Sequence, residues 1–151
     1  MSSEHNKSIK NRFQILLIDD NPADSHLFET ALREVSARAI LYWVATGEEA
    51  LEYIAQQGRF QNAGEVDIIV LDLNLPGLSG FEVLTKLRQN AASRHKPVIV
   101  LSSSRAQSDI KQAYVMGANS YVLKAMSFET YLERVERLVK YWFDTVELPN
   151  Q

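Results

Sequence analysis

Five short apolar runs alternate with stretches of helical periodicity, and this alternation limits the fold more than any other feature of the chain. Short apolar runs bounded by polar residues are typical of buried parallel strands. We expect the strands at about Gln14 to Ile18, Ala39 to Val44, Asp67 to Leu71, Pro97 to Leu101 and Ser120 to Leu123. Five βα units in succession predict an α/β domain, a doubly wound parallel sheet with helices on both faces.

Start and stop signals place the five intervening helices. Asn21-Pro22 is an N-cap residue followed by proline at the first helical position. Thr46 and Glu49 have the spacing of a capping box. We expect the helices at about Pro22 to Val35, Gly47 to Gln57, Gly80 to Gln89, Gln107 to Met116 and Ser127 to Phe143.

Composition excludes several classes of function. The 151 residues suggest one domain, and the absence of cysteine rules out a disulfide framework or a thiolate site. The net charge of −3 provides no broad basic face, so we expect no direct DNA binding. No apolar run approaches the roughly 20 residues of a membrane helix, and no signal peptide is evident, so we expect a cytoplasmic protein with no membrane contact.

Acidic residues and a lysine follow three of the predicted strands. Asp19 and Asp20 follow the first strand, Asp72 the third and Lys124 the fifth. The carboxyl ends of parallel strands meet at one edge of an open sheet, where ligands bind. Like charges are costly to bring together without a cation, and Mg²⁺ prefers such hard oxygen ligands. The pattern predicts a magnesium site, with Asp20 and Asp72 as direct ligands and Asp19 acting through a water.

Each of these residues also has an ordinary structural interpretation. Asp19-Asp20-Asn21 is a common way to cap a helix, and Asp72 is compatible with a plain turn at a strand end. A buried carboxylate can alternatively attack phosphorus as a nucleophile. Ser102, with nearby backbone N–H groups, is suited to bind phosphate oxygens, although a serine triplet is usually a polar loop. Lys124 is suited to pair with Asp72 or with its phosphoryl group, although a lone lysine at a strand end is usually solvated.

Taken together and in order, these residues resemble the receiver domain of two-component response regulators. The resemblance covers about Phe13 to Tyr141 and includes the loop Asp72-x-x-x-Pro76-Gly77-x-x-Gly80. It implies a flavodoxin-like five-stranded sheet in the order 2-1-3-4-5 with five helices. Residues 1–11 have no apolar periodicity, so we expect a flexible tail there. We expect the receiver at residues 12–143 and an extension at residues 144–151 that is too short for an effector domain.

The resemblance implies a role for each site residue. Asp72 would accept a phosphoryl group from a phosphohistidine of a sensor histidine kinase. Asp20, Asp72 and the backbone carbonyl of Asn74 would bind Mg²⁺, while Asp19 positions a water on the metal. Lys124 and Ser102 would bind the phosphoryl oxygens, and Tyr121 matches the rotating switch aromatic of the family. For Tyr121 the ordinary interpretation is a half-buried aromatic in an edge strand.

Two features depart from the common receiver pattern. Ala125 stands where receivers usually have a proline, often with a cis peptide. Since a non-proline cis bond costs roughly 3–4 kcal/mol, we expect the Lys124-Ala125 turn to be either trans and rearranged or strained. The second departure is the aromatic sequence Tyr141-Trp142-Phe143. With Asn21-Pro22-Ala23-Asp24, it is similar to single-domain regulators that partner phytochrome-type kinases.

We therefore expect a stand-alone response regulator that catalyses only its own phosphorylation and dephosphorylation and signals through a protein-binding surface. One alternative is an interaction module that works without phosphorylation. The other is a Mg²⁺-dependent aspartyl-phosphate phosphatase, which is disfavoured because such enzymes need an aspartate where this chain has Asn74.

The apolar stripe of the last predicted helix is wider than one buried face requires, and it ends in the three aromatics. Receivers often pair through the fourth helix, the fifth strand and the fifth helix, so the resemblance implies a homodimer through these elements, and we expect the C-terminal tail to take part. The alternative is that residues 144–151 fold back and cover Trp142 within one chain.

Overall fold

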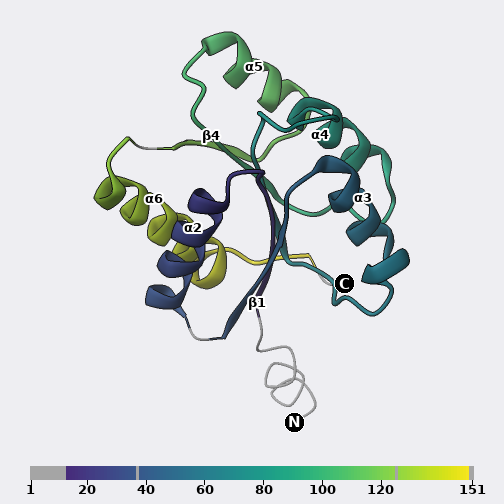
Figure 1. The fold of residues 1–151 in the computed structure, drawn as a ribbon, viewed down its shortest axis with the longest axis horizontal. Helices are drawn as coiled ribbons and strands as arrows, with labels where there is room; N and C mark the ends of the chain where they lie inside the picture. The colour runs from purple at the N-terminus through teal and green to yellow at the C-terminus, as the bar shows by residue number, and fades with distance from the viewer. Residues whose placement is uncertain (1–12, 37, 125, 150–151) are drawn as a thin grey trace.

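The structure, a computed structural model, describes residues 13–36, 38–124 and 126–149. Its centre is a five-stranded parallel sheet in the order β2-β1-β3-β4-β5 (Figure 1). The strands are β1 (Phe13–Ile18), β2 (Ala39–Val44), β3 (Ile68–Leu71), β4 (Val98–Ser102) and β5 (Ser120–Leu123). Order and direction confirm the predicted fold, and the strand limits differ from the predicted ones by one residue at most.

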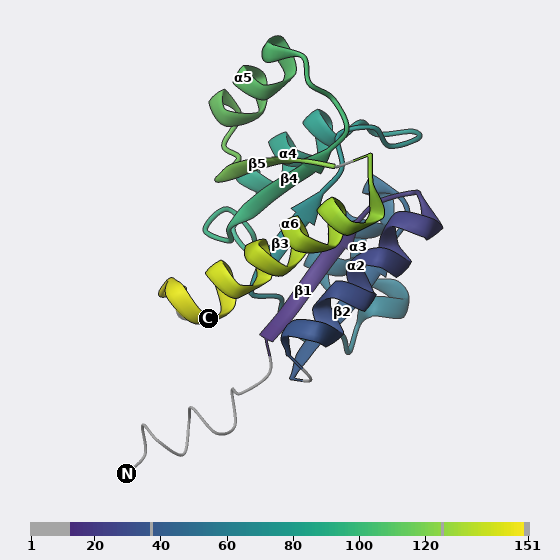
Figure 2. The same cartoon turned by 90° about the vertical axis from the view of Figure 1, so that its left-hand side faces the viewer.

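Helices cover both faces of this sheet (Figures 1 and 2). On one side α2 (Pro22–Val35) packs beside α6 (Phe128–Lys140), and on the other lie α3 (Gly47–Ala55), α4 (Gly80–Gln89) and α5 (Gln107–Val115). A short 3₁₀ helix, η1 (Gly58–Phe60), follows α3, and a π-helical turn, η2 (Tyr141–Thr145), follows α6. In the described part of the chain, no helix is long and apolar enough to cross a membrane.

The capping residues explain where the helices begin. The Asn21 side chain accepts hydrogen bonds from the backbone N–H groups of Ala23 and Asp24, so Asn21 is the N-cap of α2. Thr46 accepts from the backbone of Glu49, as predicted, but the Glu49 carboxylate meets the Thr46 hydroxyl instead of the Thr46 backbone. A reciprocal capping box does occur at α4, between Ser79 and Glu82.

The sheet separates two hydrophobic clusters, one on each face. All four residues of β3 are buried, as are all five of β4, because helices cover both of their faces. Gly80, the first residue of α4, lies so close to the end of β3 that a β-carbon there would be 2.5 Å from the carbonyl oxygen of Asp72. The absence of a side chain at Gly80 therefore lets α4 pack directly against the segment that carries Asp72.

The C-terminal region differs from the predicted continuous helix. Helix α6 ends at Lys140, and the chain continues through η2, so the three aromatics do not share one face. Phe143 packs edge-on against Phe13 of β1, with 5.2 Å between the ring centroids. Trp142 and Leu148 are partly buried against the same cluster, while Tyr141 stays half exposed. Part of the predicted aromatic patch thus belongs to the protein's own core.

Two predicted features fall outside the described residues. The N-terminal tail at residues 1–11 is one, and the Lys124-Ala125 turn is the other, since Ala125 is not described.

Candidate functional site

Three strand ends bring the predicted acidic residues and the lysine together. In the sheet Ile18 of β1 lies beside Leu71 of β3, so Asp19 and Asp72 emerge from neighbouring strands at the same edge. Lys124 follows the last residue of β5, and its backbone N–H donates to the carbonyl of Ser102 at the end of β4. The arrangement of β1, β3 and β5 therefore directs two carboxylates and one ammonium toward a common point.

Lys124 lies at the centre of this site. Its Nζ donates to Asp19 Oδ2 at 2.8 Å, to Asp24 Oδ2 at 2.8 Å and to Asp72 Oδ2 at 2.9 Å. The Lys124 side chain is only 10% exposed, and those of Asp19 and Asp72 are 2% and 8% exposed. Because water is largely excluded, these ion pairs are strong and mutually dependent.

Burial and charge act in opposite directions on the pKa values here. Burial alone would lower the pKa of Lys124, but the hydrogen bonds to Asp19 and Asp24 and the nearby negative charges raise it above its ordinary value. Burial is the largest influence on the pKa of Asp19 and raises it, while Lys124 and the Asn21 backbone N–H work to lower it. Lys124 consequently stays charged and supports the ionised form of Asp19.

The three predicted metal-binding carboxylates have the geometry of a cation site. One oxygen from each of Asp19, Asp20 and Asp72 lies within 4.8 Å of the others. The second oxygens of two of them are fixed by backbone N–H groups: Asn21 donates to Asp19 Oδ1 at 2.9 Å, and Asn74 donates to Asp72 Oδ1 at 3.1 Å. An all-oxygen, anionic donor set suits a hard divalent cation such as Mg²⁺. Since Asn21 caps α2, the capping interpretation does not account for Asp19 and Asp20.

An open cavity of about 480 Å³ lies over these carboxylates. Its lining consists of polar and charged side chains together with one methionine: Asp20, Asn21, Asp24, Asp72, Asn74, Ser103, Arg105, Lys124 and Met126. Asp20 and Asn74 are exposed, so a small anion or a partner's side chain can reach the buried Asp72 from this side.

The two predicted switch residues lie beside this cavity and do not line it. Ser102 is fully buried, and its hydroxyl accepts a hydrogen bond from the backbone N–H of Ser104 at 3.3 Å. The Tyr121 hydroxyl donates to the carbonyl of Ser104 at 2.9 Å, and its ring packs against the core. Ser104 also donates from its own hydroxyl to Asp109 at 2.6 Å. Ser104 thus connects both switch residues to α5.

Three residues of the site were given no role in it from the sequence: Asp24, Arg105 and Trp43. Asp24 lies in the first turn of α2, where an acidic residue normally indicates only a favourable interaction with the helix dipole. Its one positional signal is the spacing of four from Asp20. The Trp43 indole N–H donates to the backbone carbonyl of Asp19 at 2.6 Å, a contact that follows from the pairing of Trp43 with Leu17 across β2 and β1.

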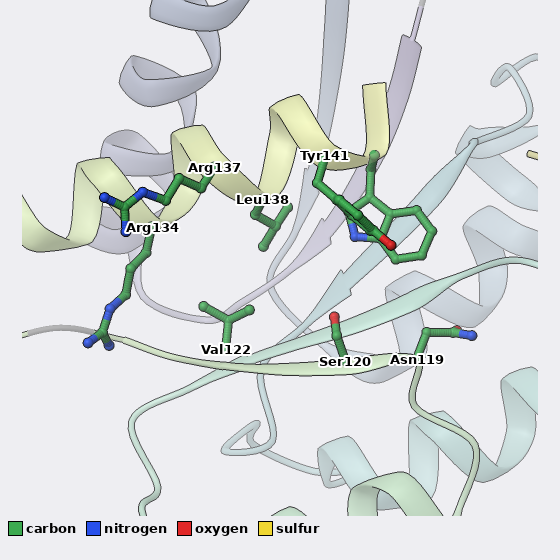
Figure 3. Close-up of a pocket in the computed structure, with 8 residues that line it drawn as sticks. Asn119, Ser120, Val122, Arg134, Arg137, Leu138 and Tyr141 are labelled. Atoms are coloured by element: carbon green, nitrogen blue, oxygen red, sulfur yellow. The ribbon is translucent and has the colours of Figure 1, made fainter. Parts of the chain in front are cut away.

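A second hollow, of about 560 Å³, lies between β5 and α6 (Figure 3). Val122 and Ser120 project from β5, and Leu138 and Tyr141 descend toward them from the C-terminal half of α6 and η2. Arg134 lies at one end of the hollow, and its guanidinium donates to the backbone carbonyl of Leu123 at 2.7 Å. This hydrogen bond satisfies the carbonyl of the last residue of the edge strand β5.

Comparison with known proteins agrees with this architecture. A family model described as the response regulator receiver domain matches residues 15–136. Response regulator Rcp1 of Synechocystis sp. is 33% identical over 135 residues, which cover 89% of this chain and 92% of that protein.

Two solved structures are similar over nearly their whole length. The phosphorylated cyanobacterial phytochrome response regulator RcpA superposes with a TM-score of 0.88 at 34% identity, covering 92% of this chain and 99% of RcpA. The Mn²⁺-bound form of Rcp1 gives a TM-score of 0.86 at 33% identity, covering 91% and 99%. The chain therefore belongs to the response regulator receiver domain family and is a response regulator with a divalent-metal site at Asp19, Asp20 and Asp72.

Proposed function

We propose that this response regulator accepts a phosphoryl group on Asp72 from the phosphohistidine of a phytochrome-type sensor histidine kinase. One observation carries the proposal: Asp72 is a buried carboxylate that faces an open cavity, next to a lysine whose side chain is only 10% exposed and two further carboxylates. The partner follows from the similarity to RcpA and Rcp1, since RcpA is described as a phytochrome response regulator. We further propose that the protein works in the cytoplasm.

The chemistry that the site supports is phosphoryl transfer by positioning and charge neutralisation. A carboxylate oxygen of Asp72 forms the new bond to phosphorus as the bond to the donor nitrogen or oxygen breaks, and the leaving group keeps that electron pair. Lys124, already 2.9 Å from Asp72, would bind a phosphoryl oxygen. Asp20, Asp72 and the Asn74 carbonyl would hold Mg²⁺, with Asp19 holding a water beside it. The ion would neutralise charge on the phosphoryl oxygens.

The same geometry supports a protein that catalyses only reactions of its own aspartyl phosphate. Asn74 is the second residue after Asp72, and a neutral amide there cannot act as the acid or base of a phosphatase that turns over external substrates. We propose that Ser102 and Tyr121 transmit phosphorylation to the surface, because Ser104 joins them both to α5.

We also propose that this surface includes a dimer interface formed by α5, β5, α6 and the C-terminal segment. Exposed apolar side chains on these elements support it: Tyr114, Val115, Phe128 and Tyr141. Tyr141 also lines the hollow between β5 and α6 (Figure 3). Phe143 is not part of the proposed interface, because it packs against Phe13 of its own chain.

The main proposal is tested by Asp72→Asn, which keeps the shape of the side chain and removes the nucleophilic oxygen anion. Incubated with acetyl phosphate and Mg²⁺, the parent should gain the mass of one phosphoryl group, and the variant should gain none. Glu34→Gln, which removes an exposed charge from α2, is the matched control and should behave as the parent does. Normal phosphorylation of the Asp72 variant would show that the acceptor lies elsewhere.

A further inference from the structure

The ammonium group of Lys124 has no N–H left for a phosphoryl oxygen. A lysine ammonium carries three donors, and Lys124 directs one to each of Asp19, Asp24 and Asp72. Three contacts of 2.8 to 2.9 Å use the full donor capacity of the group. If Lys124 is to bind a phosphoryl oxygen on Asp72, one of these three hydrogen bonds has to be exchanged.

The three carboxylates differ in how easily Lys124 can release them. The side chain of Asp19 is 2% exposed and that of Asp72 is 8% exposed, whereas that of Asp24 is 23% exposed. Released into the cavity, the carboxylate of Asp24 regains water, while the buried carboxylate of Asp19 would lose its counter-ion and pay its full desolvation cost. In addition, backbone N–H groups hold the second oxygens of Asp19 and Asp72 in place.

The backbone around Asp24 is held independently of its carboxylate. Its N–H donates to the Asn21 side chain at 3.3 Å, and its carbonyl accepts from the hydroxyl of the buried Tyr131 on α6 at 3.2 Å. Exchange at Lys124 therefore requires only rotation of the Asp24 side chain, into the cavity that it already lines. Neither α2 nor α6 has to move.

We propose that Asp24 occupies the phosphoryl-binding N–H of Lys124 in the unphosphorylated protein and is displaced when Asp72 is phosphorylated. The inference rests on the proposed function of Asp72. As the bond between an Asp72 oxygen and phosphorus forms and the leaving group departs with its electron pair, a phosphoryl oxygen takes the N–H that Asp24 gives up. Asp24 contacts Lys124 and not the reacting atoms, so it is a positioning residue that opposes phosphorylation.

The test compares Asp24→Asn with the parent and with Glu34→Gln, which removes the same charge from an exposed position of the same helix. A neutral amide is a weaker acceptor for Lys124, so the exchange becomes easier. At saturating Mg²⁺, we expect the rate constant for phosphorylation by acetyl phosphate to rise about tenfold in Asp24→Asn, and to stay at the parent value in Glu34→Gln.

Three further measurements separate displacement from a general change in structure. Beryllofluoride, a non-covalent phosphoryl mimic, should bind Asp24→Asn about tenfold more tightly than the parent after correction for Mg²⁺ affinity. In a crystal structure of the parent with beryllofluoride, the Asp24 carboxylate should lie beyond hydrogen-bond distance from Lys124 Nζ. A melting temperature for Asp24→Asn close to that of the parent would show that the fold is retained.

The outcomes separate this inference from the proposed function. A parent that takes no phosphoryl group overturns the proposed function and the inference with it. A parent that is phosphorylated, with an Asp24→Asn rate constant equal to or below its own, overturns the inference alone. An intact contact between Asp24 and Lys124 in the beryllofluoride complex would also overturn it.

Discussion

Replacing Lys124 by methionine should destabilise the fold severely, and a divalent cation should reverse much of the loss. The substitution keeps most of the aliphatic volume and removes the charge. It leaves Asp19 and Asp72, both nearly buried, and the partly buried Asp24 without their shared counter-ion. Breaking a buried ion pair by removing one partner costs about 3–5 kcal/mol, because an uncompensated charge remains in a medium of low polarity.

That cost translates into a measurable shift in melting temperature. For a chain of this size, 1 kcal/mol corresponds to about 2–4 °C, so a loss of 3–5 kcal/mol predicts a fall of about 6–20 °C. Mg²⁺ binds the native carboxylates and stabilises the native state by mass action. Without the competing lysine charge, added Mg²⁺ should raise the melting temperature of Lys124→Met more than that of the parent.

The loss of stability caused by Lys124→Met should change with pH in one direction. Burial already raises the pKa of Asp19, and without Lys124 the pKa of the carboxyl should rise further. A carboxyl whose pKa is higher in the folded than in the unfolded state binds more protons when folded. Lowering the pH through the folded-state pKa therefore stabilises the fold. The difference in the free energy of unfolding between the parent and Lys124→Met should therefore be smaller at mildly acidic pH than at neutral pH.

Differential scanning calorimetry with and without Mg²⁺, at two pH values, measures all three effects. Lys111→Met removes a lysine charge from an exposed position of α5 and should change stability by no more than about 0.5 kcal/mol. The reasoning fails if Lys124→Met melts within 3 °C of the parent. It also fails if Mg²⁺ shifts the parent and the variant equally.

Two more predictions concern the packing behind the site and the surface away from it. Gly80→Ala should destabilise the protein by about 1–3 kcal/mol in urea denaturation, because the new β-carbon would meet backbone atoms of Asp72 and Leu73, which cannot rotate away; an unchanged midpoint would contradict the close approach of α4 to β3. In analytical ultracentrifugation the parent should sediment as a dimer at micromolar concentration, and replacement of the half-exposed Tyr141 by serine should favour the monomer. A parent that stays monomeric with and without acetyl phosphate would exclude the dimer.

The sequence was sufficient to predict those features that depend on strand ends. Asp19, Asp20, Asp72 and Lys124 each follow an apolar run, and parallel pairing places such positions at one edge of the sheet whatever the details of side-chain packing. The sheet order came from the resemblance to receivers, because the alternation of strands and helices does not by itself determine which strands are neighbours. The helix starts were predictable where a single side chain caps the backbone, as Asn21 does.

The features that sequence alone did not predict depend on side-chain direction. The contact of Asp24 with Lys124 joins residues 100 positions apart and depends on how α2 lies against the end of β5. Phe143 was assigned to an exposed aromatic patch because α6 was expected to continue to that residue. The π-helical turn that begins at Tyr141 changes the angle between successive side chains, which allows Phe143 to meet Phe13.

The hydrogen bonds of Ser104 suggest how the active site and the surface are connected. Its backbone N–H donates to the Ser102 hydroxyl, and its carbonyl accepts from the Tyr121 hydroxyl. Its own hydroxyl donates to the carboxylate of Asp109 in α5. If the Ser102 hydroxyl turns toward a phosphoryl group on Asp72, the N–H of Ser104 loses its acceptor, and the β4–α5 loop has to rearrange to satisfy it. That rearrangement would alter the acceptor of the Tyr121 hydroxyl and the first turn of α5 together. The proposed dimer surface includes α5 and β5, so these hydrogen bonds of Ser104 would connect Ser102 to it.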